Sequence, residues 1–192
     1  MIKFNVITSA EIAIKSNVGT HEQRKNLIQQ AWLYKSNHSS IDNTNDKCWR
    51  SYFKYENIDW LLLELDKNLN DVISHYLKID KSYSSRIKRK NNSIITYWTN
   101  INEPGSVNRL HTHRQDAFSA VYYLQAENTG EITFYNSSNI LNECNLNSPF
   151  VSRMSFQPKN GDLFIWPGWI PHEVERNTSN EFRINIAFNI NI

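Results

Sequence analysis

Three histidines in two separate regions have the spacing of a metal site. His111 and His113 stand two positions apart at the end of the run PGSVNRLHTH, residues 104–113. In an extended strand, side chains at positions i and i+2 point to the same face, so both imidazoles can bind one ion through nitrogen. His172 follows a second run, in which the apolar residues LFIW lead into a Pro/Gly turn. We therefore predict that His111, His113 and His172 bind one metal ion.

The elements that must carry these histidines are strands in the second half of the chain. After residue 90, segments rich in β-branched and aromatic residues alternate with turn signals at residues 103–105, 128–130 and 159–161. The expected strands are Ile94–Ile101, Ala117–Gln125, Glu131–Tyr135, Asp162–Trp166 and Arg183–Ile192. In the last strand the apolar side chains alternate, which puts them together on one face of a sheet.

The first ninety residues follow a helical pattern instead. In residues 58–79, apolar side chains recur at intervals of three and four, which gathers them on one face of a long helix. A shorter helix is expected over residues 22–34 with Thr20 as its N-cap, followed by a loop over residues 36–46. Strands after helices favour a β-sandwich or jelly roll supported by helices. We expect one domain over residues 1–192, in which residues 1–90 support a jelly-roll core of residues 91–192.

Composition excludes several other classes of protein. The formal net charge is only +2, so nothing favours nucleic acid as a partner, and we interpret the basic run at residues 86–90 as a solvated loop. Cys48 and Cys144 have no zinc-type spacing and do not make a disulfide framework. No run approaches the roughly 18 apolar residues of a membrane span, and the N-terminus lacks the apolar segment of a signal peptide. We expect a cytoplasmic protein. No metal-site pattern surrounds the remaining histidines, His21, His38 and His75.

Taken in order, the motifs resemble those of the 2-oxoglutarate and iron(II)-dependent oxygenases, near the prolyl-hydroxylase-like branch. They are NEPG at 102–105, HTH at 111–113, VYYL at 121–124, PHEV at 171–174 and RINI at 183–186. The resemblance covers residues 94–192, and the tail RINIAFNI is similar to a bacterial and phage subgroup that also tends to carry His-x-His. It implies a double-stranded β-helix (jelly roll), mainly β with N-terminal helices, and it implies Fe(II) and 2-oxoglutarate as cofactors.

The chain departs from the family pattern at one ligand. The family uses two histidines and one carboxylate, whereas His113 stands at the carboxylate position. Three interpretations follow. His111, His113 and His172 form a three-histidine site, which we favour. Alternatively, a bulge turns Asp116 inward as the carboxylate, or only two residues bind the metal.

The same resemblance assigns residues to 2-oxoglutarate. Arg183 opens the last strand, and its planar fork suits the distal carboxylate of the co-substrate. Tyr123 matches a family tyrosine that often contacts the same carboxylate, although Tyr122 takes its place if the register slips by one residue. Asn102, or alternatively Asn100, is a weaker candidate for co-substrate binding. We interpret Trp98, Trp166 and Trp169 as packing residues.

The resemblance implies an oxygenase that hydroxylates an unactivated C–H bond. Its substrate would be a small molecule or an amino-acid or protein side chain, with no membrane partner, and the sequence does not indicate the substrate or the oligomeric state. The main alternative is a cupin-type metal-binding protein or a three-histidine dioxygenase that does not use 2-oxoglutarate. Residues 117 and 118 are Ala and Phe where a cupin carries Glu, and Arg183 has no role in a cupin. A jelly roll with a purely structural role would be expected to lose some of these ligand positions.

Overall fold

The computed structural model describes residues 11–41, 45–79, 94–113, 115–135 and 153–192. The basic run at 86–90 and Cys144 lie outside these residues. The helices are α1 (His21–Asn37) and α2 (Asp59–Ile79). The strands are β1 (Ala13–Lys15), β2 (Asp46–Ser51), β3 (Ile94–His111), β4 (Phe118–Gln125), β5 (Ile132–Tyr135), β6 (Arg153–Phe156), β7 (Leu163–Pro167), β8 (His172–Val174) and β9 (Arg183–Asn191).

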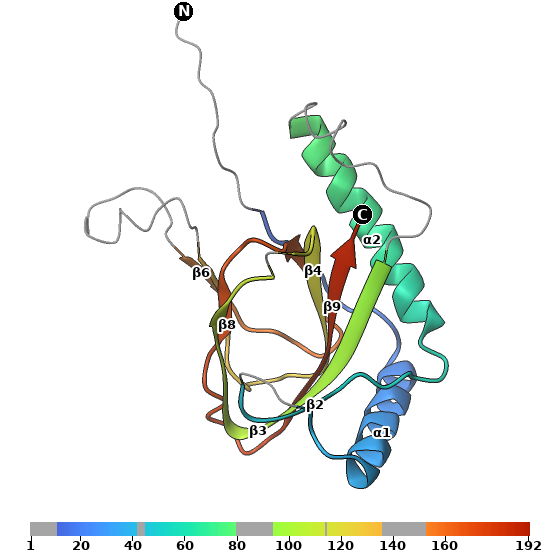
Figure 1. The fold of residues 1–192 in the computed structure, drawn as a ribbon, viewed down its shortest axis with the longest axis vertical. Coiled ribbons are helices and arrows are strands. Elements are labelled where there is room, and N and C mark those ends of the chain that lie inside the picture. Colours follow the sequence, from blue (N-terminus) through green and yellow to red (C-terminus); the bar gives the residue numbers. More distant parts are fainter. Residues whose placement is uncertain (1–10, 42–44, 80–93, 114, 136–152) are drawn as a thin grey trace, which may run out of the picture.

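The strands form a curled antiparallel arrangement in the order β1-β7-β4-β9-β3-β8-β5-β6, with β2 paired to β3. The long strand β3 takes part in two sheets. Its first part pairs with β9 and β2 in a larger sheet that also contains β4, β7 and β1, and its end pairs with β8 in a smaller sheet completed by β5 and β6. Figure 1 shows β8 and β6 on the opposite side of the molecule from the helices. The smaller sheet therefore curls over the face of the larger sheet that the helices do not cover.

The two helices form where the periodicity predicts them. Thr20 caps α1 in a capping box, because its side chain accepts from Gln23 N–H and the Gln23 side chain accepts from Thr20 N–H. The α1 helix runs three residues beyond the predicted end, to Asn37. In α2 the spacing of three and four residues puts Leu61, Leu65 and Leu69 in the core with no exposed surface. This core lies between the helices and the larger sheet.

The alternation of β9 separates the structural face of the larger sheet from a polar face. Ile184, Ile186, Phe188 and Ile190 are fully buried in the core on the helix side. The intervening side chains, including those of Arg183 and Asn185, point to the space between the two sheets. Both are buried as well. A second apolar cluster from β4, β5, β7 and β8 fills part of that space.

Three expectations about local structure were wrong. Residues 103–105 do not end a strand, because β3 continues through them to His111. Gly105 has φ +82°, and the pairing with β2 shifts its register between Asn102 and Val107, so the strand bends here without terminating. The expected loop at 36–46 contains the end of α1 and the start of β2. Strands β1, β2, β6 and β8 were missed because they are short and are held by pairing with residues far away in the chain.

We propose that residues 1–192 form one domain, because both helices share a hydrophobic core with the larger sheet. The first ninety residues supply two strands as well as the helices, so their role goes beyond support. In the part of the chain that the structure describes, no helix has the length and apolar character needed to cross a membrane.

The packing of α2 can be tested with two leucines of the same helix. Leu65 is fully buried, whereas Leu63 is 70% exposed. Leu65→Ala should lower the free energy of unfolding by about 2–5 kcal/mol, because it leaves a cavity in the core. Leu63→Ala should change it by no more than about 0.5 kcal/mol. Denaturant titration of both variants measures the difference, and equal effects would show that α2 does not pack by this face.

Candidate metal centre and adjoining cavity

The three predicted histidines meet at the junction of β3 and β8. His111 ends β3 and is the register partner of His172, the first residue of β8. His113 follows two residues after β3, and the potential ligand atoms of the three side chains lie within 4.8 Å of one another. The ring centroids are 4.3 Å (His111–His172), 5.1 Å (His111–His113) and 5.3 Å (His113–His172) apart. Within the described residues no other group of three potential metal ligands comes this close together.

Backbone carbonyls orient two of the rings. Nδ1 of His111 lies 2.7 Å from the carbonyl oxygen of Arg109, and Nδ1 of His172 lies 3.0 Å from that of Ile170. A carbonyl can only accept, so each Nδ1 carries a proton and each Nε2 keeps its lone pair. This arrangement of a donor to the backbone and a free second nitrogen is the one that metal-binding histidines use.

Burial keeps all three rings neutral. The pKa of His172 is lowered to about 3 and that of His113 to about 4, mainly by burial and to a smaller extent by neighbouring basic side chains. The pKa of His111 is also lowered, mainly by burial. Rings with these pKa values are unprotonated at neutral pH, so a cation can bind without first displacing protons.

A close backbone approach positions His113. Its N–H donates to the carbonyl of Gly168 at 2.7 Å. A Cβ on residue 168 would lie 2.6 Å from the carbonyl oxygen of His113 and 2.3 Å from that of Asp116. Only glycine leaves room for this contact, so the turn after β7 holds the segment that carries His113.

Asp116 does not join the histidines. It is absent from the group of converging ligand atoms, and its Oδ1 accepts from Nδ2 of Asn191 at 3.1 Å. The structure thus brings together the three side chains of the favoured interpretation and directs the alternative carboxylate to the end of β9.

A cavity of about 230 Å³ adjoins the histidines, between the larger and the smaller sheet. Among the described residues that line it, aromatic and amide side chains predominate and none is acidic. Trp98 and Trp166 line it while remaining 6% and 2% exposed, so they are packing residues that also form its wall. Trp169 is not part of the lining and is 43% exposed.

Arg183 is buried beside this cavity with no carboxylate partner among the described residues. Its side chain is 0% exposed. Nη1 donates to the carbonyl of Thr129, and Nη2 donates to Oδ1 of Asn108 at 3.4 Å, but Nε has no hydrogen-bond partner in the described structure. Burial lowers the pKa of Arg183 from its ordinary value. A buried guanidinium with an unused donor is costly unless an anion joins it.

The register of β4 decides between the two tyrosines. Tyr122 points away from the cavity, because its hydroxyl donates to the carbonyl of Val18 at 2.6 Å in the helix-side core. Tyr123 points the other way and lines the cavity. Burial raises the pKa of the Tyr123 hydroxyl, and the charge of Arg183 opposes that shift. Tyr123 thus lies close enough to Arg183 for the charge of the guanidinium to affect its hydroxyl.

The two candidate asparagines have different roles. Asn100 lines the cavity, and its Nδ2 donates to Oδ1 of Asn185 at 2.9 Å. Asn102 is fully buried outside the lining, and its Nδ2 is 3.4 Å from the carbonyl oxygen of Arg183. Asn102 therefore contacts the backbone of Arg183, and Asn100 is the residue that the structure exposes to a bound molecule.

Sequence reasoning missed part of the lining. Arg50, Asn108 and Ser119 all line the cavity. Arg50 lies on β2, a strand that the pattern did not predict. Ser119 lies within the predicted strand 117–125, and Asn108 lies in the run 104–113 that carries His111 and His113; their position on a sheet face is the signal that could have found them.

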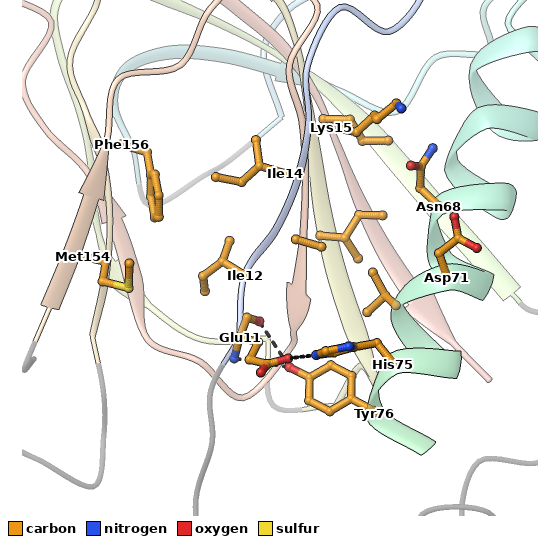
Figure 2. Close-up of a pocket in the computed structure, with 14 residues that line it drawn as sticks. Glu11, Ile12, Ile14, Lys15, Asn68, Asp71, His75, Tyr76, Met154 and Phe156 are labelled. Carbon is orange, nitrogen blue, oxygen red and sulfur yellow. Dashed lines mark hydrogen bonds and ion pairs between the residues drawn. The ribbon is translucent and has the colours of Figure 1, made fainter. Parts of the chain in front are cut away.

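A larger cavity, of about 550 Å³, lies elsewhere (Figure 2). It is bounded by β1, α2, β6 and β7, and it meets β7 through Leu163 and Ile165, on the opposite face from Trp166. Its walls are mainly apolar, and Figure 2 shows His75 paired with Glu11 at one end. His75 thus pairs with Glu11 and lines a different cavity from His111, His113 and His172. His21 begins α1, and His38 stacks on Tyr34, so neither joins the metal centre.

The comparisons agree with the geometry. Residues 96–189 match the family described as "Putative 2OG-Fe(II) oxygenase". That span runs from β3 into β9 and contains all three histidines and Arg183. No curated protein matches the chain.

Solved structures share the fold at low sequence identity. A Pseudomonas putida prolyl-4-hydroxylase has a TM-score of 0.61 and 13% identity, over 95% of this chain and 93% of that one. HygX from Streptomyces hygroscopicus, with nickel and 2-oxoglutarate bound, has a TM-score of 0.58 and 11% identity, over 95% and 83%. A Trichoplax adhaerens prolyl hydroxylase in complex with a hypoxia inducible factor peptide fragment has a TM-score of 0.60 and 16% identity, over 93% and 82%. The jelly-roll fold is therefore confirmed.

Metal analysis tests the ligand set. The wild-type protein should hold one divalent ion per chain after anaerobic loading, and His172→Ala should lose most of it, because a site with two of its three ligands is weak. Full metal content in His172→Ala would exclude that residue as a ligand.

Parallel variants of His113 and Asp116 separate the three-histidine interpretation from the one in which Asp116 is the carboxylate ligand. His113→Ala should weaken metal binding more than Asp116→Ala, because Asp116 hydrogen-bonds Asn191 outside the group. Dissociation constants for the metal in the two variants measure this. The reverse order would establish Asp116 as the carboxylate ligand.

The glycine contact gives a third test. Gly168→Ala should weaken metal binding roughly tenfold or more, the scale seen when the groups that orient a ligand are disturbed. The new Cβ must push back the backbone that carries His113. Ala117→Gly is a suitable control, since residue 117 is exposed. Unchanged metal affinity in Gly168→Ala would show that this turn does not position the ligand.

Proposed function

Residues 96–189 place this chain in the 2-oxoglutarate and iron(II)-dependent oxygenase superfamily, and on that premise we propose that it hydroxylates an unactivated C–H bond. Its cofactors are Fe(II) and 2-oxoglutarate. The single observation that carries the proposal is the pairing of two features at one cavity: three converging neutral imidazoles that line it, and a buried guanidinium beside it that has no acidic partner among the described residues. The first suits a divalent metal, and the second suits the far carboxylate of the co-substrate.

We assign iron(II) to His111, His113 and His172. Neutral imidazole nitrogen is a good donor for iron(II), and the three side chains converge from one side. When bound, iron(II) and 2-oxoglutarate supply the oxidising chemistry, in which 2-oxoglutarate loses carbon dioxide to give succinate as oxygen is consumed. The protein contributes the orientation of the rings through the Arg109 and Ile170 carbonyls.

We assign the distal carboxylate of 2-oxoglutarate to Arg183, with Tyr123 beside it. The unused Nε donor of Arg183 and the absence of any acidic side chain in the described cavity lining support this assignment. Thr129 and Asn108 hold the other two nitrogens, so the guanidinium is already oriented before an anion arrives. A charge-assisted bidentate contact of this kind fixes a carboxylate in one place. Asn100 provides an amide group in the same wall.

Aromatic rings pack against one side of the metal centre. Trp166 packs edge-on against His172 at 4.8 Å between centroids, and Phe134 lies 5.9 Å from the same ring. These rings make the surroundings of the metal apolar, which favours direct contact between the cofactors and a C–H bond. We propose a small molecule, or an amino-acid or protein side chain, as the substrate.

No observation on the described residues favours the cupin alternative. A cupin would need no buried cation next to its metal site, whereas Arg183 is fully buried beside this one.

Binding of 2-oxoglutarate is the experiment that tests the proposal. Anaerobic titration of the iron(II) protein should produce the weak visible charge-transfer band of an iron(II)–keto-acid chelate. Arg183→Ala should bind 2-oxoglutarate at least about tenfold more weakly, because removing one partner of a buried charge pair typically costs about 2–5 kcal/mol. Arg153→Ala, on the exposed strand β6, is the matched control and should bind normally.

Two outcomes would contradict it. If the iron-loaded wild-type protein does not bind 2-oxoglutarate, the cupin-type alternative replaces the oxygenase. If Arg183→Ala binds as tightly as the wild type, another residue holds the carboxylate.

A further inference from the structure

Arg50 is the charged side chain of the cavity that the co-substrate assignment leaves unused. Among the described residues that line the cavity, it is the only Lys, Arg, Asp or Glu. It lies near the end of β2, opposite Asn100 of β3. Among the residues that the structure describes, no acidic side chain forms an ion pair with it.

Aromatic rings hold the Arg50 guanidinium in place. Its central carbon lies 4.4 Å from the centroid of the Trp98 ring and 5.4 Å from that of Tyr52. Nη2 donates to the Tyr52 hydroxyl at 2.9 Å. Nε is buried and has no hydrogen-bond partner in the described structure. The group is therefore oriented by stacking, and part of its donor edge remains available to a bound molecule.

Arg50 lines the cavity, whereas Arg183 lies beside it. Arg50 stacks on Trp98, whereas Arg183 is the register partner of Asn102, four residues further along β3. Four residues of a strand span roughly 13 Å. Trp98 is also the neighbour of His113, with 6.1 Å between ring centroids. Arg50 thus lies with Trp98 and His113, whereas Arg183 contacts Asn108 and the Thr129 carbonyl.

The charge of the filled site also calls for a second anion. The three imidazoles are neutral, so the ligand set contributes no negative charge to balance iron(II). The two carboxylates of 2-oxoglutarate balance the metal, and the two guanidinium groups then leave the cavity positive. No acidic side chain among the described lining residues offsets this charge.

We propose that Arg50 binds a carboxylate group of the substrate, so that the substrate is a carboxylic acid held with its anionic end over Trp98 and its carbon skeleton near the histidines. The inference rests on the proposed oxygenase function and names the substrate class of that site. Planar stacking exposes the edge of the guanidinium, which matches the planar fork of a carboxylate. Arg50 is thereby a specificity-determining residue that does not touch the co-substrate.

The test uses propanoate and propanamide, two probes of the same shape that differ in charge. The protein is loaded with zinc(II), which is diamagnetic, and saturated with 2-oxoglutarate so that Arg183 is already occupied. Nitrogen-15 NMR of the arginine Nε–H groups identifies the Arg50 resonance as the one missing in Arg50→Lys. Propanoate should shift this resonance in a saturable manner, and propanamide should bind about tenfold more weakly, since a charge-assisted hydrogen bond is about twice as strong as a neutral one.

Two variants complete the binding experiment. Because Arg50→Gln lacks the Nε–H reporter, the indole N–H resonance of Trp98 reports binding in wild type and variants. Arg50→Gln should lose the preference for propanoate over propanamide, whereas Arg153→Gln should keep it. If both probes bind equally to the wild type, if neither binds, or if Arg50→Gln retains the preference, the proposal is overturned.

The co-substrate titration separates this inference from the proposed function. The charge-transfer band with 2-oxoglutarate should form in Arg50→Gln with an affinity close to that of the wild type. If Arg50→Gln weakens 2-oxoglutarate as much as Arg183→Ala does, Arg50 belongs to the co-substrate site and the inference fails while the oxygenase stands. Absence of the band in the wild type would instead refute the oxygenase itself.

Discussion

The site depends on one strand, β3, being shared by two sheets. Its first part pairs with β9 in the larger sheet, and its end pairs with β8 in the smaller one. The bend between them occurs at Gly105, whose positive φ suits glycine. Asn177 and Arg176 hold this bend, since Gly105 N–H donates to the Asn177 carbonyl and Arg176 donates to the Gly105 carbonyl. Because the same strand turns from one sheet to the other, it delivers cavity-lining side chains from its first part and His111 from its end.

The second physical theme is charge that the protein itself does not balance. Arg50 lines the cavity and Arg183 adjoins it, and no acidic side chain is present among the described lining residues. The three histidines that also line the cavity are neutral. Burying Arg183 without an anion costs free energy in the folded protein. On the proposed function, a dianion bound at Arg183 and a divalent metal would offset that cost by mass action, because they bind the folded state and not the unfolded chain. The buried guanidinium that lowers the stability of the folded protein is therefore also the group that we propose selects an anionic ligand.

The two faces of β9 show how stability and chemistry are kept apart. Its isoleucines and Phe188 pack against the helix-side core, where α2 contributes its buried leucines. The opposite face carries Arg183 and Asn185 toward the space between the sheets. A single alternating strand thus belongs at once to the hydrophobic core and to the wall of the cavity. The helices support the site without contributing side chains to the described lining of the cavity.

Local patterns in the sequence determined the helices, most strands of the jelly roll and the three histidines, because periodicity and i, i+2 spacing depend only on neighbours along the chain. The motif positions also indicated Arg183. Only the tertiary structure decided that Tyr123 and not Tyr122 faces the cavity, that Asn100 lines it in place of Asn102, that β3 bends at residues 103–105 without ending, and that Arg50 enters from β2. Each of these depends on strand register and on pairing between residues far apart in the chain, where a shift of one position exchanges the two faces of a strand.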